Sequence, residues 1–105
     1  MKQRPPPRSQ RDAQAQRDAA TALAIAALGF IGQEPERLGR FLALSGIGPE
    51  SLRAAAREPG FLLGVLDHLA GDETLLLAFA EVQAIDPAQV GQARALLAGE
   101  SPQEP

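Results

Sequence analysis

The 105-residue chain lacks cysteine, tryptophan and tyrosine, and it has only one histidine. Without cysteine it can form no disulfide and no thiolate zinc site, and thiolate catalysis is excluded. A long apolar run is also missing, since the stretch from Ala19 to Ile31 covers about thirteen residues and a membrane span needs roughly twenty. That stretch therefore predicts a buried helix, and the chain length predicts a single hydrophobic core.

Acidic residues are absent from the first eleven positions, which carry Lys2, Arg4, Arg8 and Arg11. The other positions hold six arginines and all thirteen carboxylates, so we expect the folded body to be acidic. An acidic surface repels a phosphate backbone, whereas proteins that bind nucleic acid usually concentrate lysine and arginine where they bind it. The composition argues against a general nucleic-acid-binding surface.

Both ends of the chain are predicted to be disordered. Residues 1–11 form a basic, proline-rich arm, in which three consecutive prolines favour an extended conformation and little apolar surface can offset the entropy of ordering. No apolar run follows its basic residues, so the arm does not resemble a signal peptide, and we expect a cytoplasmic protein. Residues 100–105 form a second disordered tail. A single helical domain is then expected over residues 12–99.

Four prolines mark predicted helix starts in this domain. Each follows an acidic residue or a glycine, and proline is favoured at the first helical position because its missing N–H needs no partner there. The four pairs are Glu34-Pro35, Gly48-Pro49, Glu58-Pro59 and Asp86-Pro87. In addition, Asp86 and Gln89 fit a capping box, and Gly71-Asp72 fits a helix end followed by a new N-cap. Because β-branched residues are few and no apolar residues alternate, we expect an all-α, compact bundle of about six short helices and no strand.

Apolar residues at helical spacing predict the core of this bundle. They are Leu23, Ala27, Phe30 and Ile31, then Leu38, Phe41 and Leu42, then Phe61, Leu62, Val65, Leu66 and Leu69, and finally Val90, Ala93, Leu96 and Leu97. The segment from Leu75 to Val82 is apolar on nearly every side. It is therefore predicted to be the most enclosed helix and the axis of the core.

A short glycine turn is the one motif that suggests a binding function. Within residues 44–52, Gly46, Ile47, Gly48 and Pro49 resemble the helix-hairpin-helix element of many DNA repair and recombination proteins. In that family the apolar residue between the glycines plugs the hairpin into the core, and backbone N–H groups at the next helix hold a phosphate. The resemblance makes seven residues candidate contacts for a phosphate or a partner. They are Gly46, Ile47 and Gly48 with the nearby arginines Arg37, Arg40, Arg53 and Arg57.

The same turn also has a purely structural explanation. A glycine at position 46 can end one helix in the left-handed conformation, Ile47 can supply the hydrophobic contact that accompanies such an end, and Pro49 can start the next helix. Glu50 stands where the family often has a basic residue, and Leu52 stands where a small alanine is usual. These two departures favour a plain helix corner.

Three blocks of sequence resemble one family as a whole. The blocks are PERLGRFLALSGIGP (residues 35–49), FLLGVLDHL (residues 61–69) and DETLLLAF (residues 72–79). Their order and spacing are similar to those of a family of small bacterial proteins catalogued only as a domain of unknown function, over roughly Asp18 to Leu97. The resemblance implies a short helical protein that occurs as a stand-alone chain, and it implies no activity for any residue.

Reactive side chains do not form a recognisable catalytic or metal-binding pattern. His68 lies near Asp67 and Asp72 in sequence, but further ligands are lacking, and the serines have no neighbouring general base. We therefore predict no enzyme, no cofactor, and no catalytic, cofactor-binding or metal-binding residue. The expected function is a non-catalytic protein-interaction module that binds an unknown protein partner or a second copy of itself, with no membrane partner. The alternative is weak, sequence-independent contact with a nucleic-acid backbone through the Gly-Ile-Gly-Pro hairpin.

Overall fold

A computed structural model describes the backbone of residues 8–99 and the side chains of residues 11–99. Over this range the chain is all-α and has no strand, as predicted. The elements in order are α1 (Arg8–Gly32), α2 (Pro35–Ser45), the 3₁₀ helix η1 (Pro49–Ser51), α3 (Leu52–Ala55), α4 (Pro59–Ala70), α5 (Glu73–Gln83) and α6 (Ala88–Leu97). The prediction of a bundle of about six helices is confirmed, although α1, with 25 residues, is not short.

The predicted start signals lie where the helices begin. Pro35 and Pro59 are the first residues of α2 and α4, whereas Pro49 begins the 3₁₀ helix η1. Asp72 caps α5, because its Oδ1 accepts a hydrogen bond from the Leu75 N–H at 3.1 Å. These local signals act within one turn of chain, which explains why they can be recognised without knowledge of the fold.

The capping box before α6 also forms. The Asp86 N–H donates to Gln89 Oε1 at 3.2 Å, and Asp86 Oδ1 accepts from the Ala88 N–H at 2.9 Å. Each side chain thus satisfies a backbone group that would otherwise lack a helical partner.

The first helix begins a few residues before the predicted start of the domain at residue 12. We predicted disorder over residues 1–11, and α1 begins at Arg8. The last proline of the arm is Pro7, and the residues that follow are mainly arginine, glutamine and alanine, which are good helix formers. The helix can therefore extend back to the last helix breaker. Residues 1–7 and the predicted tail at 100–105 lie outside the described residues.

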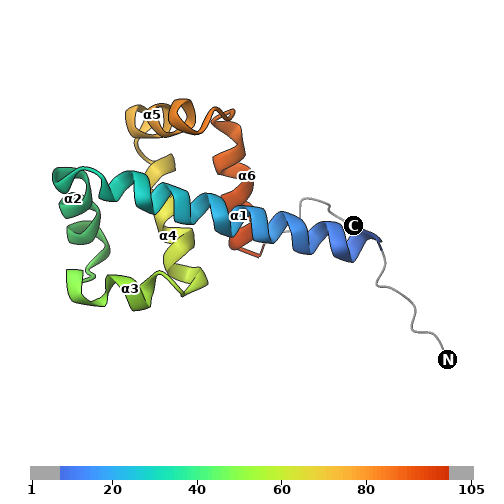
Figure 1. The fold of residues 1–105 in the computed structure, drawn as a ribbon, viewed down its shortest axis with the longest axis horizontal. Helices are drawn as coiled ribbons and strands as arrows, with labels where there is room; N and C mark the ends of the chain where they lie inside the picture. Colours follow the sequence, from blue (N-terminus) through green and yellow to red (C-terminus); the bar gives the residue numbers. More distant parts are fainter. Residues whose placement is uncertain (1–7, 100–105) are drawn as a thin grey trace.

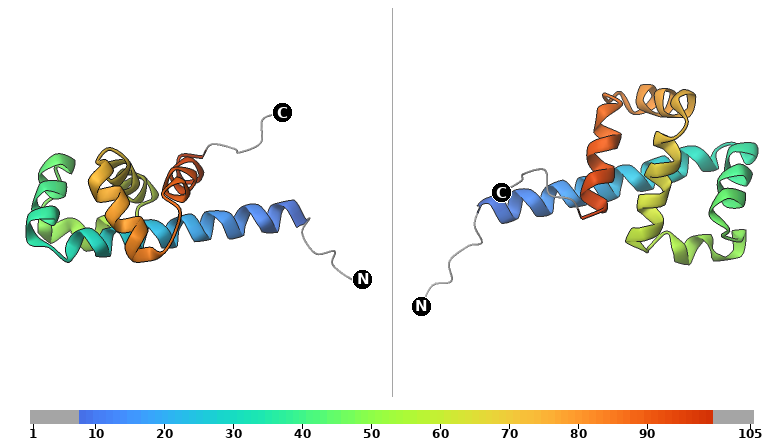
Figure 2. Two further views of the ribbon diagram at one scale, coloured as in Figure 1. Left: turned by 90° about the horizontal axis from the view of Figure 1, so that it is seen from above. Right: turned by 180° about the vertical axis from the view of Figure 1, so that it is seen from behind.

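Three helices pack against one another to form the centre of the fold. The helices α4 and α6 lie side by side and both cross α1, while α2 and α3 lead from the end of α1 to α4, and α5 connects α4 to α6 (Figure 1). The first part of α1, drawn in blue, extends beyond α6 and away from the other helices (Figure 2). Despite the length of α1, none of the helices within residues 8–99 is both long and apolar enough to span a membrane.

The four phenylalanines form two ring pairs that tie separate helices together. Phe30 of α1 lies 5.5 Å from Phe79 of α5, and Phe41 of α2 lies 5.6 Å from Phe61 of α4, measured between ring centroids. Both separations are typical of favourable aromatic pairs. Most predicted core residues are buried, and Leu23, Leu38, Leu42, Phe61, Leu96 and Leu97 are partly buried against them.

The prediction that residues 75–82 form the most enclosed helix is wrong. In α5, Leu77 and Val82 expose 48% and 65% of their surface, because this helix packs mainly on α4 and lies at the edge of the bundle. The more enclosed helix is α4, which contacts α1, α5 and α6 and buries Leu62, Val65, Leu66 and Leu69. Apolar residues on every side of a helix do not determine where that helix is placed.

Candidate functional site

The predicted hairpin residues Gly46, Ile47 and Gly48 form a sharp corner after α2. Gly46 ends the helix with a left-handed φ of 76°, and its N–H donates to the Leu42 carbonyl at 2.9 Å. Ser45 Oγ donates to the same carbonyl at 3.1 Å and accepts a hydrogen bond from the Ile47 N–H at 3.4 Å. The corner thus satisfies these backbone groups with its own atoms, as helix ends commonly do.

The chain after this corner differs from the second helix of a helix-hairpin-helix element. It continues as the three residues of η1 and the four residues of α3, so the aligned N–H groups and dipole of a long helix are missing. The Glu50 side chain folds back toward the corner, and a Cβ placed on Gly48 would lie 2.5 Å from Glu50 Oε2. A carboxylate beside the turn disfavours a bound phosphate. This geometry favours a structural corner, and phosphate contact stays a prediction.

The four arginines predicted to flank the hairpin have different surroundings. Arg37 lies over the Phe30 ring of α1, with its guanidinium carbon 4.8 Å from the ring centroid. Its Nε lies 3.9 Å from Glu34 Oε1. This cation–π contact joins α2 to α1. Arg40 lies near enough to His68 to act on it electrostatically, and Arg53 and Arg57 are exposed in α3 and after it.

A depression lies beside the corner, between α2 and α4. It has a volume of about 490 Å³ and is lined by Phe41, Leu44, Ser45, Ile47, Gly60, Phe61, Gly64, Asp67 and His68. The space beside Gly60 and Gly64 is open, because a Cβ on either residue would have no other atom within 4 Å. Of its lining, only Ile47 was predicted as a site residue, since the depression depends on how α2 and α4 are placed.

His68 forms one wall of this depression. Its ring contacts the Phe41 ring edge-on, with 5.1 Å between the centroids. Burial lowers the pKa of His68 below its usual value, and the positive charge of Arg40 lowers it further, while Asp72 has the opposite effect. Both main causes favour the neutral imidazole.

We expect the His68→Gln variant to lose less stability than the wild type when the pH falls from about 7.5 to about 5.5. Because the pKa of His68 is lowered in the folded state, the unfolded chain takes up this proton first as the pH falls through about 6.5. The contribution of neutral His68 to the free energy of unfolding is therefore fully present above that pH, and it decreases as the pH falls below it. Denaturant unfolding of both proteins at the two pH values measures the difference. Equal losses in the two proteins would contradict the prediction.

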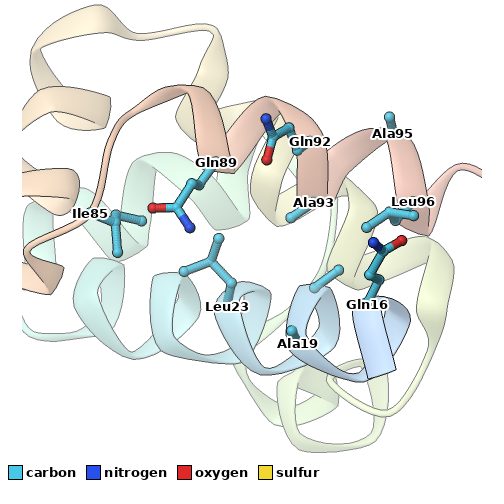
Figure 3. A pocket seen from close by; sticks show the side chains of 10 residues that line it. Gln16, Ala19, Leu23, Ile85, Gln89, Gln92, Ala93, Ala95 and Leu96 are labelled. Carbon is cyan, nitrogen blue, oxygen red and sulfur yellow. The ribbon is translucent and has the colours of Figure 1, made fainter. Parts of the chain in front are cut away.

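A second and larger opening runs between α1 and α6, and we call it the α1/α6 groove. Its volume is about 580 Å³, and it is lined by Gln16, Ala19, Ala20, Leu23, Ile85, Gln89, Gln92, Ala93, Ala95 and Leu96. Figure 3 shows Leu23 pointing from α1 toward Gln89 of α6, and Gln16 lying next to Leu96. None of these residues is charged. The groove therefore offers apolar side chains and three amide groups.

The α1/α6 groove is not evident from the sequence. The apolar spacing predicts Leu23, Ala93 and Leu96 only as core residues, and it gives the glutamines no role. One signal was available, because Gln89 and Gln92 interrupt the apolar side of the last helix next to Val90 and Ala93. Two amides beside an apolar stripe indicate a surface that is neither fully buried nor strongly hydrated.

Comparison with known proteins gives one result. No curated protein and no solved structure matches the chain. A family model described as "Protein of unknown function (DUF3572)" matches residues 17–100, a range that includes most of α1 and all of the following helices. The match confirms the resemblance to a family of unknown function that the three sequence blocks indicated. The chain therefore belongs to the family described as "Protein of unknown function (DUF3572)".

Proposed function

We propose that this protein is a non-catalytic protein-interaction module whose binding surface is the α1/α6 groove. The observation that carries the proposal is an open, uncharged groove of about 580 Å³ between two helices. Its lining is mainly alanine, leucine and isoleucine, with Gln16, Gln89 and Gln92 among them. Apolar lining with a few polar groups is typical of surfaces that bind other molecules.

A helix is the partner that fits this groove best. The groove is lined by about two turns of each helix, residues 16–23 of α1 and 89–96 of α6, so part of a third helix can pack there against both. Apolar side chains of the partner would gain by leaving water, and the three amides can hydrogen-bond to polar groups at its edges. A charged side chain would lose hydration there without gaining an opposite charge.

The surroundings of the reactive side chains support a non-catalytic role. The groove lining contains no titratable residue. In the depression between α2 and α4, Asp67 Oδ1 accepts a hydrogen bond from Arg94 Nε, and the Ser45 hydroxyl donates to the Leu42 carbonyl. Acid-base catalysis would need such groups to converge on a substrate. Nucleic-acid contact through the corner is a weaker alternative, because the carboxylate of Glu50 lies beside it.

Site-specific photo-crosslinking of the full chain tests the proposed surface. A benzophenone amino acid replaces Gln92 in the groove or, as a control, Gln83, which is exposed at the end of α5 and does not line the groove. We expect irradiation in cells to join a protein to position 92 and none to position 83. Mass spectrometry then identifies the joined chain. Failure to crosslink at position 92, or equal crosslinking at both positions, would contradict the proposal.

A further inference from the structure

Carboxylates stand at both ends of the α1/α6 groove. Figure 3 shows Ile85 at one end of the opening and Gln16 at the other. Asp86 directly follows Ile85, and its N–H donates at 3.2 Å to Oε1 of Gln89, which lines the groove. Beyond the other end, Asp12 precedes Gln16 by about one helical turn. Both aspartates are exposed, so each can meet a partner that lies in the groove.

The side of α1 on which Asp12 lies follows from the helical repeat. Successive residues turn by about 100°, which places Asp12 within about 40° of Gln16 and Leu23 in the groove lining. Arg11 and Arg17 lie about 110° or more from the middle of that side. A helix bound in the groove would therefore lie nearer to the carboxylate than to either arginine.

The end of the groove next to Asp86 has no basic residue on either helix that forms it. In α1, residues 21–33 carry no charge. In α6, Arg94 is the only charged residue, and its Nε donates to Asp67 Oδ1 of α4. It lies about 140° or more around α6 from the glutamines of the groove. The charge that a partner meets at this end is therefore negative.

We propose that the helix bound in the α1/α6 groove belongs to another protein and carries a basic residue at each end of its apolar side. The inference rests on the proposed function and adds the chemistry of the partner. Apolar side chains in the middle of this helix contact the uncharged lining, and lysine or arginine just beyond them lies near Asp12 and Asp86. Residues 12–23 of α1 extend about 16 Å, so the two basic positions are roughly three turns apart.

A second copy of the chain does not match this description. Within the described residues, α5 exposes two large apolar side chains, Leu77 and Val82, and every other helix exposes at most one. The only charged residues of α5 are Glu73 and Glu81, which lie near its two ends. Bound in the groove of another copy, α5 would bring carboxylates toward carboxylates, and this repulsion disfavours self-association at the groove.

The carboxylates select the partner more than they hold it. An exposed ion pair contributes about 0.2–1 kcal/mol, so most of the affinity must come from apolar contact in the groove. Complementary charges raise the rate of association and disfavour partners with the wrong charge. A basic helix and an acidic helix with the same apolar side should therefore bind with different affinities.

Three synthetic peptides test this difference. Each is a leucine–alanine helix of about 16 residues with one tryptophan in its apolar side, and they differ only in having lysine, glutamine or glutamate at both ends of that side. Because the chain has no tryptophan, the fluorescence of the peptide reports binding to the full-length protein. We expect the lysine peptide to bind about tenfold more tightly than the glutamate peptide, with the glutamine peptide between them. The difference should decrease as NaCl is raised from about 50 mM to about 500 mM.

Variants of the two aspartates show whether the groove causes the preference. Asp86→Asn keeps the helix cap, since an asparagine oxygen can also accept the hydrogen bond from the Ala88 N–H. We expect the preference to fall to about twofold when Asp86→Asn and Asp12→Asn are combined. Asp12→Asn alone should have the smaller effect, because Arg8 lies one turn before it. Asp18→Asn is the matched control, since it makes the same change on the opposite side of α1 and should leave the preference unchanged.

The outcomes separate this inference from the proposed function. Equal affinities for the three peptides, no binding of the lysine peptide at about 1 mM, or a preference that survives in the double variant would overturn the inference. Photo-crosslinking at position 92 to a helix without basic residues at these places, or to a second copy of the chain, would also overturn it and would leave the groove as a binding surface. Failure to crosslink at position 92 contradicts the proposed function itself.

Discussion

The Phe79→Ala variant is expected to lose about 3–5 kcal/mol of its free energy of unfolding. Phe79 is fully buried, and its ring packs on Phe30, so it links α5 to α1. Removing the ring leaves a cavity and separates α5 from one of its few anchors, since Leu75 and Ala80 are its only other buried residues. Single domains are stable by about 5–15 kcal/mol, so a loss of this size removes a large share of the stability and, at the low end of that range, leaves the protein largely unfolded.

Phe79→Leu is the matched control for this prediction. Leucine keeps much of the buried volume, so we expect a loss of less than about 1.5 kcal/mol. Because the chain has no tryptophan or tyrosine, unfolding is best followed by far-ultraviolet circular dichroism during denaturant titration. A midpoint for Phe79→Ala equal to that of the wild type would show that Phe79 does not hold the core together.

Helix boundaries could be predicted from the sequence because they depend on nearby residues. Proline at the start of α2 and α4, the Asp72 cap and the capping box of Asp86 with Gln89 each act within a single turn. Gly46 ends α2 in the left-handed conformation for the same local reason. The start of α1 was misplaced because a basic, polar sequence is compatible both with disorder and with an exposed helix.

The candidate site could not be predicted to the same extent, because it depends on how distant segments meet. The α1/α6 groove joins Gln16 to Gln89 and Leu96, which are far apart in the chain. Periodicity within one helix gives the spacing of its apolar residues and leaves open which neighbouring helix covers them. The hairpin was recognised as a pattern, but only the structure places the Glu50 carboxylate beside Gly48.

The corrected position of the core leads to the second large effect. Leu66 of α4 is fully buried, whereas Leu77 of α5 exposes 48% of its surface. We expect Leu66→Ala to reduce the free energy of unfolding by about 2–5 kcal/mol, and Leu77→Ala to change it by no more than about 0.5 kcal/mol. Both substitutions remove the same atoms from the middle of a helix, and alanine is a good helix former, so the difference measures burial alone.

This pair of variants distinguishes two descriptions of the same sequence. If α5 were the axis of the core, as its apolar sequence suggests, Leu77→Ala would be as costly as Leu66→Ala. If α4 is the enclosed helix, only Leu66→Ala has a large effect. Denaturant midpoints measured under identical conditions decide between them. Equal losses would contradict the prediction that α4, and not α5, is the enclosed helix.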